Sequence, residues 1–155
     1  MKEHQIQEIN RAKLEEVAFF CACANLRKAS RAVTQLYDEL LRPTGLRATQ
    51  YTLLVTLQLA GPIAISELAH LMGMDRTTLT RNLALVEKGG WATIAKGDDQ
   101  RTHLVTLTRE GSEAIAKALP LWEQAQERVV SELGRERFNT LLAHLSDVTE
   151  LSSEP

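Results

Sequence analysis

The segment Asp75–Thr108 constrains the fold most, because it has the pattern of a capped helix followed by a two-stranded hairpin. Asp75 is a favoured N-cap residue, and Gly89-Gly90 is the kind of pair that ends a helix. Between them, apolar residues at i, i+4 and i+7 predict one buried helix face: Leu79, Leu83 and Val86. Two short runs, Trp91–Ala95 and Thr102–Leu107, then predict the strands of a hairpin.

The opposite face of this predicted helix carries side chains that hydrogen-bond phosphates and base edges: Arg76, Thr77, Thr78, Arg81 and Asn82. They gather toward the helix N-terminus, the end with which a recognition helix meets the major groove of DNA. An ordinary solvated helix face is the alternative. Because threonine is a poor helix former, the run TTLT weakens the helix unless its side chains are used. This favours DNA contact.

A shorter helix is predicted directly before this one. Ser66 is expected to cap Glu67–Met72, and Gly73 to end it, with only Met74 before the cap at Asp75. Two short helices joined by a turn that contains glycine are the helix-turn-helix pattern. Together with the hairpin, they predict a winged helix-turn-helix.

Helical patterns flank this region on both sides. They predict helices over His4–Leu41 and Thr49–Leu59, over Arg109–Leu133 with Thr108 as its cap, and through Phe138–Val148. The first is apolar over more than one stripe, which predicts cover by another subunit. The expected fold is mainly α, with a winged helix-turn-helix domain at residues 46–108. Residues 1–45 and 109–155 form the flanking dimerisation helices.

The charge distribution agrees with a local DNA-binding face. The 155-residue chain carries a formal net charge of −2, but Arg76–Arg109 holds six basic and three acidic residues. That segment is therefore +3 and the rest of the chain −5, and DNA binding needs only a local basic surface. No apolar run approaches the roughly 20 residues that span a bilayer, and we expect a cytoplasmic protein.

Other classes of site find little support. The sequence contains no glycine-rich phosphate loop, no HExxH and no G-x-S-x-G motif, so we expect no enzyme and no cofactor. The histidines are scattered without ligands at metal-binding spacing, so we expect no metal site. Cys21 and Cys23 form no disulfide framework, and two residues on one helix point about 200° apart.

The arrangement resembles the multiple-antibiotic-resistance regulator (MarR) family over nearly the whole chain. The matching segments are LRATQYTLL (46–54), ISELAHLMGMDRTTLTRNLALVEKGGW (65–91) and GDDQRTHLVTLTREG (97–111). The resemblance implies a homodimer built from the first and last helices. It also implies binding to a pseudo-palindromic double-stranded DNA operator, usually as a repressor that a ligand or an oxidant releases.

The wing segment is the most specific part of this resemblance. The family's wing typically runs Asp, Asp, basic, Arg, small, and here Gln100 replaces the basic residue. The family's wing arginine corresponds to Arg101, which suits insertion into a narrow minor groove. Asp99 would orient its guanidinium through a paired hydrogen bond. The alternative is a surface turn with a solvated salt bridge.

Cys23 and Tyr37 keep the fourteen-residue spacing of the organic-hydroperoxide-sensing branch of the same family. Other positions depart from that branch: its further tyrosines are replaced by Ala48-Thr49 and by Arg27. A sensing thiol needs donors that stabilise its thiolate, which Arg27 or Arg31 could supply. The alternative is a pair of small, inert residues in a packed helix.

Three functions follow from the sequence. The first is a homodimeric repressor released by a small-molecule effector that enters between the dimerisation helices and the winged domains. An anionic effector, such as an aromatic carboxylate or an acyl-thioester, could use Arg27, Lys28 or Arg31. The second is a thiol-based oxidant-sensing repressor that uses Cys23, and the third is a winged-helix protein–protein adaptor.

Overall fold

The computed structural model describes residues 10–97 and 102–151. The flanking helices in the order of the chain are α1 (Arg11–Phe20), α2 (Ala22–Leu41), the short 3-10 helix η1 (Arg42–Thr44), α6 (Arg109–Leu133) and α7 (Arg135–Glu150). Between η1 and α6 lie α3 (Ala48–Ala60), β1 (Ile63–Ala64), α4 (Ile65–Leu71), α5 (Arg76–Lys88), β2 (Ala92–Lys96) and β3 (His103–Leu107). The chain divides into two units, at residues 1–35 and 36–155.

The first unit corrects the expectation of one uninterrupted helix over His4–Leu41. Helix α1 ends at Phe20, and Cys21 has an extended backbone with φ −64° and ψ 111°. The side-chain amide of Asn25 donates to the carbonyls of Phe19 and Cys21, at 3.1 and 3.0 Å. Asparagine thus supplies donors for carbonyls at the break, which is how this residue type competes with helical backbone pairing.

The second unit contains the winged helix-turn-helix. Its sheet has the order β1-β3-β2, and β3 pairs antiparallel with both neighbours. Val105 lies at the centre, opposite Ile63 on one side and Ile94 on the other. The largest fully buried side chains are Leu41, Leu53, Leu54, Leu57, Leu68, Leu79, Leu83, Val86 and Val105. The core therefore joins α3, α4 and α5 to one face of the sheet, and it also takes Leu41 from α2.

The helix-turn-helix forms as predicted except at its start. Helix α4 begins at Ile65 with Ala64 at its N-cap, so Ser66 lies within the first turn and does not cap the helix. The preceding residues pair with β3, which leaves no room for the expected cap because the chain passes directly from strand to helix. Gly73 then adopts φ 59°, a left-handed conformation that glycine adopts without steric cost.

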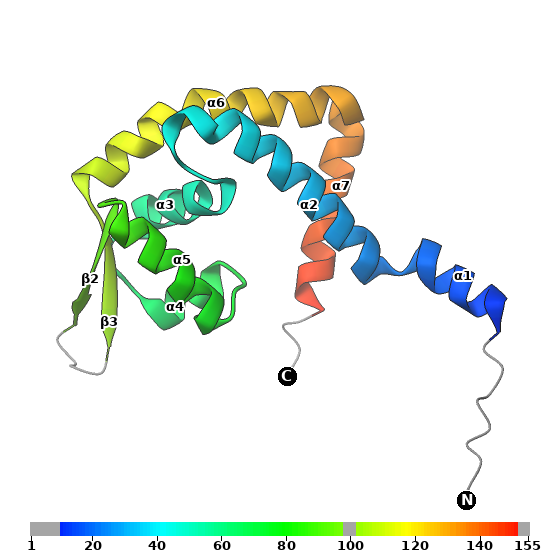
Figure 1. Ribbon diagram of the computed structural model, residues 1–155, viewed down its shortest axis with the longest axis horizontal. Helices are drawn as coiled ribbons and strands as arrows, with labels where there is room; N and C mark the ends of the chain where they lie inside the picture. Colours follow the sequence, from blue (N-terminus) through cyan, green and yellow to red (C-terminus); the bar gives the residue numbers. More distant parts are fainter. Residues whose placement is uncertain (1–9, 98–101, 152–155) are drawn as a thin grey trace, which may run out of the picture. The chain divides into compact units, whose positions relative to one another are not determined.

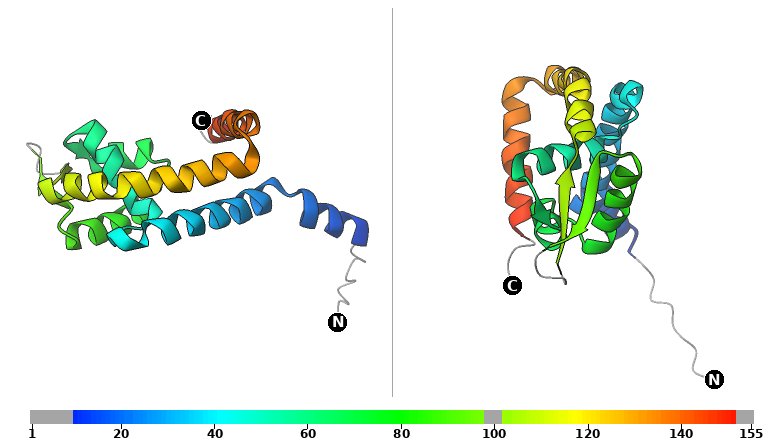
Figure 2. Two further views of the ribbon diagram at one scale, coloured as in Figure 1. Left: turned by 90° about the horizontal axis from the view of Figure 1, so that it is seen from above. Right: turned by 90° about the vertical axis from the view of Figure 1, so that its left-hand side faces the viewer.

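The last two helices extend from the wing. Thr108 caps α6, as predicted, and Gly134, with φ 80°, separates α6 from α7. Helix α6 passes over α3 and leads to α7, which descends from the far end of α6 in the view of Figure 1 and is seen nearly end-on from above in Figure 2. Among the described residues, no helix combines the length and the apolar character required to span a bilayer.

Candidate nucleic-acid interface

Helix α5 begins at a cap that involves two residues. Asp75 has an extended backbone, and its carboxylate accepts from Thr78 twice: from the backbone N–H at 2.9 Å and from the hydroxyl at 2.6 Å. The hydroxyl bond of Thr78, followed by its backbone bond, lowers the pKa of Asp75. The predicted N-cap is confirmed, and the first turn of α5 is held in place before any partner binds.

The two faces of α5 separate as its sequence pattern predicts. Leu79, Leu83 and Val86 are fully buried against the core. Four of the five predicted contact residues are exposed: Arg76, Thr77, Thr78 and Arg81. The fifth, Asn82, is half-buried, and its amide lies 3.9 Å from the sulfur of Met74. The structure thus gives α5 a polar outer face with two arginines.

The cap changes what Thr78 can offer to DNA. A threonine hydroxyl has one hydrogen to donate and two lone pairs to accept with. Because Thr78 donates its hydrogen to Asp75, only acceptor capacity remains. Thr77 and Arg81, one helical turn apart, share the outer face and are the better candidates for donation to base edges or phosphates.

The wing lies on the same side of the molecule as the start of α5. The outer ends of β2 and β3, at Lys96 and His103, face each other across the hairpin. Figure 1 shows these ends and the N-terminal end of α5 at the lower edge of the winged domain. Asp99, Gln100 and Arg101, the predicted wing contacts, lie outside the described residues.

The base of the wing is fastened to α6. The Thr108 hydroxyl donates to the Gly90 carbonyl at 2.7 Å and accepts from the Gly111 N–H at 3.0 Å. A Cβ on Gly111 would lie 2.2 Å from the Trp91 carbonyl oxygen, so only glycine allows this approach. Trp91 packs against the core. The first turn of α6 is therefore in direct contact with the base of the wing.

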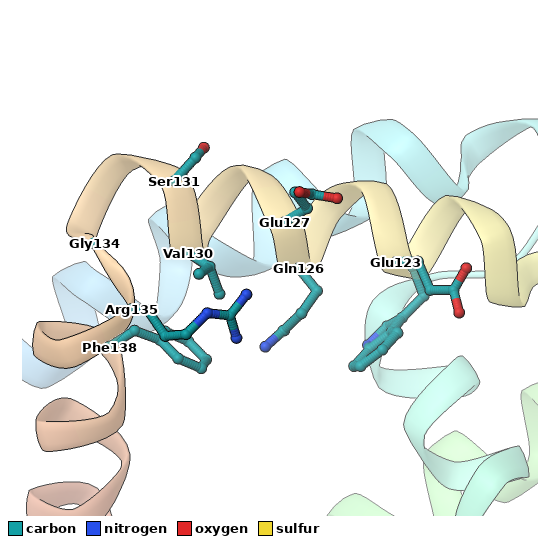
Figure 3. Close-up of a pocket in the computed structure, with 9 residues that line it drawn as sticks. Glu123, Gln126, Glu127, Val130, Ser131, Gly134, Arg135 and Phe138 are labelled. Atoms are coloured by element: carbon teal, nitrogen blue, oxygen red, sulfur yellow. The ribbon is translucent and has the colours of Figure 1, made fainter.

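A pocket of about 540 Å³ lies at the corner between α6 and α7, a second candidate site that the sequence did not predict. Its lining residues are Trp122, Glu123, Gln126, Glu127, Val130, Ser131, Gly134, Arg135 and Phe138. Figure 3 shows Gln126, Arg135 and Phe138 directed into the hollow, with Glu127 and Ser131 directed away from it. No sequence signal in the region of α6 and α7 pointed to this pocket.

Tyr37 connects α2 to this pocket. Its hydroxyl donates to Oε1 of Gln126, and burial raises the pKa of the Tyr37 phenol. This bond fixes the orientation of the Gln126 amide, so its NH₂ group remains a donor on the pocket side. Tyr37, an effector and redox candidate from the sequence, is thus held by a residue that sequence analysis did not single out.

The other effector and redox candidates lie in the first unit. Cys23, Arg27 and Arg31 are exposed on α2, and Cys21 is half-buried. Cys21 lies between α1 and α2, so the prediction that the two thiols point about 200° apart on one helix is wrong. In the described part of the chain, histidine, cysteine and carboxylate side chains form no metal-binding group of three.

Comparisons with known proteins agree with this geometry. The model of the MarR family matches residues 46–102. The HTH-type transcriptional regulator YwoH of Bacillus subtilis is 30% identical over 120 residues, which cover 77% of this chain and 87% of that protein. The multiple antibiotic resistance protein MarR of Salmonella typhimurium is 30% identical over 110 residues, covering 70% and 72%.

Solved structures extend the similarity to the flanking helices. The transcriptional regulator MosR of Mycobacterium tuberculosis, crystallised with DNA, is 38% identical with a TM-score of 0.75, covering 85% of this chain and 98% of MosR. A mutant of MarR from Escherichia coli, crystallised with operator DNA, has a TM-score of 0.77 at 23% identity. The match covers 86% of this chain and 96% of that one, and it shows a shared fold.

Proposed function

The chain belongs to the MarR family of DNA-binding transcriptional regulators, and we propose that it acts as a homodimeric repressor released from a pseudo-palindromic operator by a small-molecule effector. The main support for DNA recognition comes from the outer face of α5. There Thr77 and Arg81 are exposed on a helix whose start is fixed by Asp75 and Thr78. A rigid helix that presents an arginine and a threonine near its N-terminus suits the major groove.

Exposed apolar side chains support dimerisation. Phe19 and Phe20 of α1 are 72% and 81% exposed, and α7 exposes Leu141, Leu142 and Val148. A protein that remained monomeric would rarely leave so many large apolar groups in water. A symmetric dimer would cover them, and it would place two recognition helices for two half-sites about 34–36 Å apart.

The corner pocket between α6 and α7 suits the effector. Arg135 and Gln126 direct donors into it (Figure 3), and its lining also includes the rings of Trp122 and Phe138 and the carboxylate of Glu123. Such a set fits an anionic aromatic molecule, for example an aromatic carboxylate. Helix α6 carries this pocket near its end and the wing fastening at its start, so a ligand that displaces α6 also displaces the wing.

Selection of DNA from a random duplex pool tests the proposal. Wild type should enrich a two-fold symmetric sequence, and the double variant Thr77→Ala/Arg81→Ala should enrich none. Lys117→Ala, which removes one exposed positive charge from α6, should behave as wild type. If wild type enriches no sequence and the double variant retains regulatory activity in cells, the protein-adaptor function replaces the repressor.

An oxidant-sensing repressor is the second candidate function. The exposed Cys23 thiol favours it, because sensing cysteines must be accessible to the oxidant. The test is operator binding before and after treatment with a hydroperoxide. Loss of binding in wild type that is absent in Cys23→Ser would establish this function. An equal loss in both proteins would exclude Cys23 as the sensor.

A further inference from the structure

Two adjacent residues near the end of α2 contact two different helices. Tyr37 donates to Gln126 of α6, whereas Asp38 contacts the beginning of α3. Neighbouring residues on a helix point about 100° apart, so one turn can contact two elements at once. No sequence signal indicated the Asp38 contacts, because their partners Arg47 and Ala48 follow nine and ten residues later, after the segment Arg42–Gly45.

Asp38 supplies the N-terminal cap of α3. Its Oδ1 accepts from the Ala48 N–H at 2.7 Å, and its Oδ2 accepts from the Arg47 guanidinium at 3.0 Å. Arg47 is itself the N-cap residue, and its side chain has no acceptor with which to satisfy the helix. The Asp38 side chain is 22% exposed, compared with 75% for Arg47. A carboxylate at a helix N-terminus is also favoured by the helix dipole.

The connection between the two helices is short and well packed. Leu41 and Leu46, on either side of it, are 0% and 2% exposed. The Thr44 hydroxyl donates to the Leu41 carbonyl at 2.7 Å, and Gly45 turns the chain with φ 77°. The cap by Asp38 closes this corner, so α3 is fixed to the last turns of α2 by both apolar and polar contacts.

We infer that Asp38 is a positioning residue for operator recognition: it holds α3, and through α3 the recognition helix α5, at a fixed angle to the end of α2. This inference rests on the proposed homodimeric function. Helix α3 shares the fully buried core with α5 through leucines of both helices. Two half-sites demand a fixed spacing of two recognition helices, whereas nonspecific binding demands only positive charge. Loss of the contacts that fix α3 to the end of α2 should therefore reduce specific affinity for the operator and leave nonspecific affinity for DNA nearly unchanged.

Three substitutions separate the cap from the ion pair. Asp38→Ala removes both, whereas Arg47→Ala removes only the ion pair. Asp38→Asn keeps an Oδ1 that can accept from Ala48, so it also preserves the cap. Each protein is titrated with the duplex that wild type selects, with the same duplex lengthened or shortened by one base pair between half-sites, and with a random duplex.

Asp38→Ala should lower the ratio of specific to nonspecific affinity by about tenfold, the order of the change that loss of a helix cap makes in a folding equilibrium constant. It should also lose discrimination against the altered spacings. Random-duplex affinity should stay within about twofold, because the charges that bind phosphate are unchanged. Asp38→Asn and Arg47→Ala should behave as wild type. Wild-type behaviour of Asp38→Asn would show that the hydrogen bond from the Ala48 N–H is required and that the negative charge of Asp38 is not.

A further variant removes the same hydrogen bond by removing its donor, the Ala48 N–H. Ala48→Pro removes the donor at the first position of α3, where proline is well tolerated, and the extended Arg47 suits a following proline. It should lose spacing discrimination as Asp38→Ala does. Thermal unfolding checks that each protein is folded under the conditions of the titration. If Asp38→Ala is unfolded, the spacing discrimination of Ala48→Pro tests the inference instead.

The outcomes distinguish a failure of the role of Asp38 from a failure of the proposed function. If wild type itself shows no spacing preference, the proposed homodimeric recognition fails. If wild type discriminates and a folded variant without the cap discriminates equally, the role of Asp38 is wrong while the proposed function stands. An equal loss in Asp38→Ala and Asp38→Asn would also overturn the inference, because it would assign the effect to the charge.

Discussion

The carboxylate of Asp75 accepts two hydrogen bonds from Thr78, one from its backbone at 2.9 Å and one from its hydroxyl at 2.6 Å. The two threonines at the start of α5, Thr77 and Thr78, therefore have different roles. Thr78 completes the cap, whereas Thr77 is exposed and shares its face with Arg81.

Thr77→Ala should change the DNA sequence preference without lowering the melting temperature, because an exposed threonine contributes little to the fold. Thr78→Ala should lower the melting temperature, because it removes the hydroxyl that Asp75 accepts from. Binding to a panel of single-base operator variants, together with thermal unfolding, measures both effects. Equal effects of the two substitutions on stability would contradict the assignment.

The lowered pKa of Asp75 makes stability depend on pH. In the unfolded chain an aspartate titrates near pH 3.9, and the bonds from Thr78 favour the charged form in the folded protein. The stabilisation is therefore present above the unfolded pKa and is lost as pH falls through the folded pKa. Between pH 6 and pH 2.5, wild type should lose more stability than Asp75→Asn, as measured by urea unfolding. Parallel profiles would show that this carboxylate does not contribute.

Gly111→Ala should destabilise the protein by about 1–3 kcal/mol, the usual cost of inserting a methyl group into a close contact. The added Cβ would lie 2.2 Å from the backbone oxygen of Trp91, so the start of α6 must move away from the wing. Glu113→Ala, which breaks only an exposed ion pair with Arg109, is the control and should cost less than about 1 kcal/mol. Urea unfolding of the three proteins compares them, and similar values for both variants would argue against a tight wing–α6 joint.

The α6–α7 pocket predicts a fluorescence response. Trp122 lines the pocket and Trp91 packs at the wing base, so Trp91→Phe leaves Trp122 as the only tryptophan to report binding. Titration with benzoate should change its emission and lower operator affinity in the same concentration range. Arg135→Ala should weaken both responses, and Arg137→Ala, which lies outside the pocket lining, should not. Equal responses in the two variants would place the anion elsewhere.

The features predicted correctly from sequence depend on short-range signals. Asp75 and Thr108 lie directly before the helices that they cap, and the spacing of Leu79, Leu83 and Val86 reports one buried face. The break at Cys21 was missed because it involves the side chain of Asn25, four residues later, within a sequence that is otherwise helical. The contacts of Tyr37 and Asp38 could not be predicted, because each joins residues that only the folded chain brings together.

The most direct test of the central claim is a salt titration of operator binding by wild type, Arg81→Ala and Lys117→Ala. If the outer face of α5 binds DNA, log affinity should fall steeply with log salt, and Arg81→Ala should reduce that slope by about 0.9, the value for one lost phosphate neutralisation. Lys117→Ala should keep the wild-type slope. Identical slopes for wild type and Arg81→Ala, with equal affinities, would contradict recognition of DNA by α5.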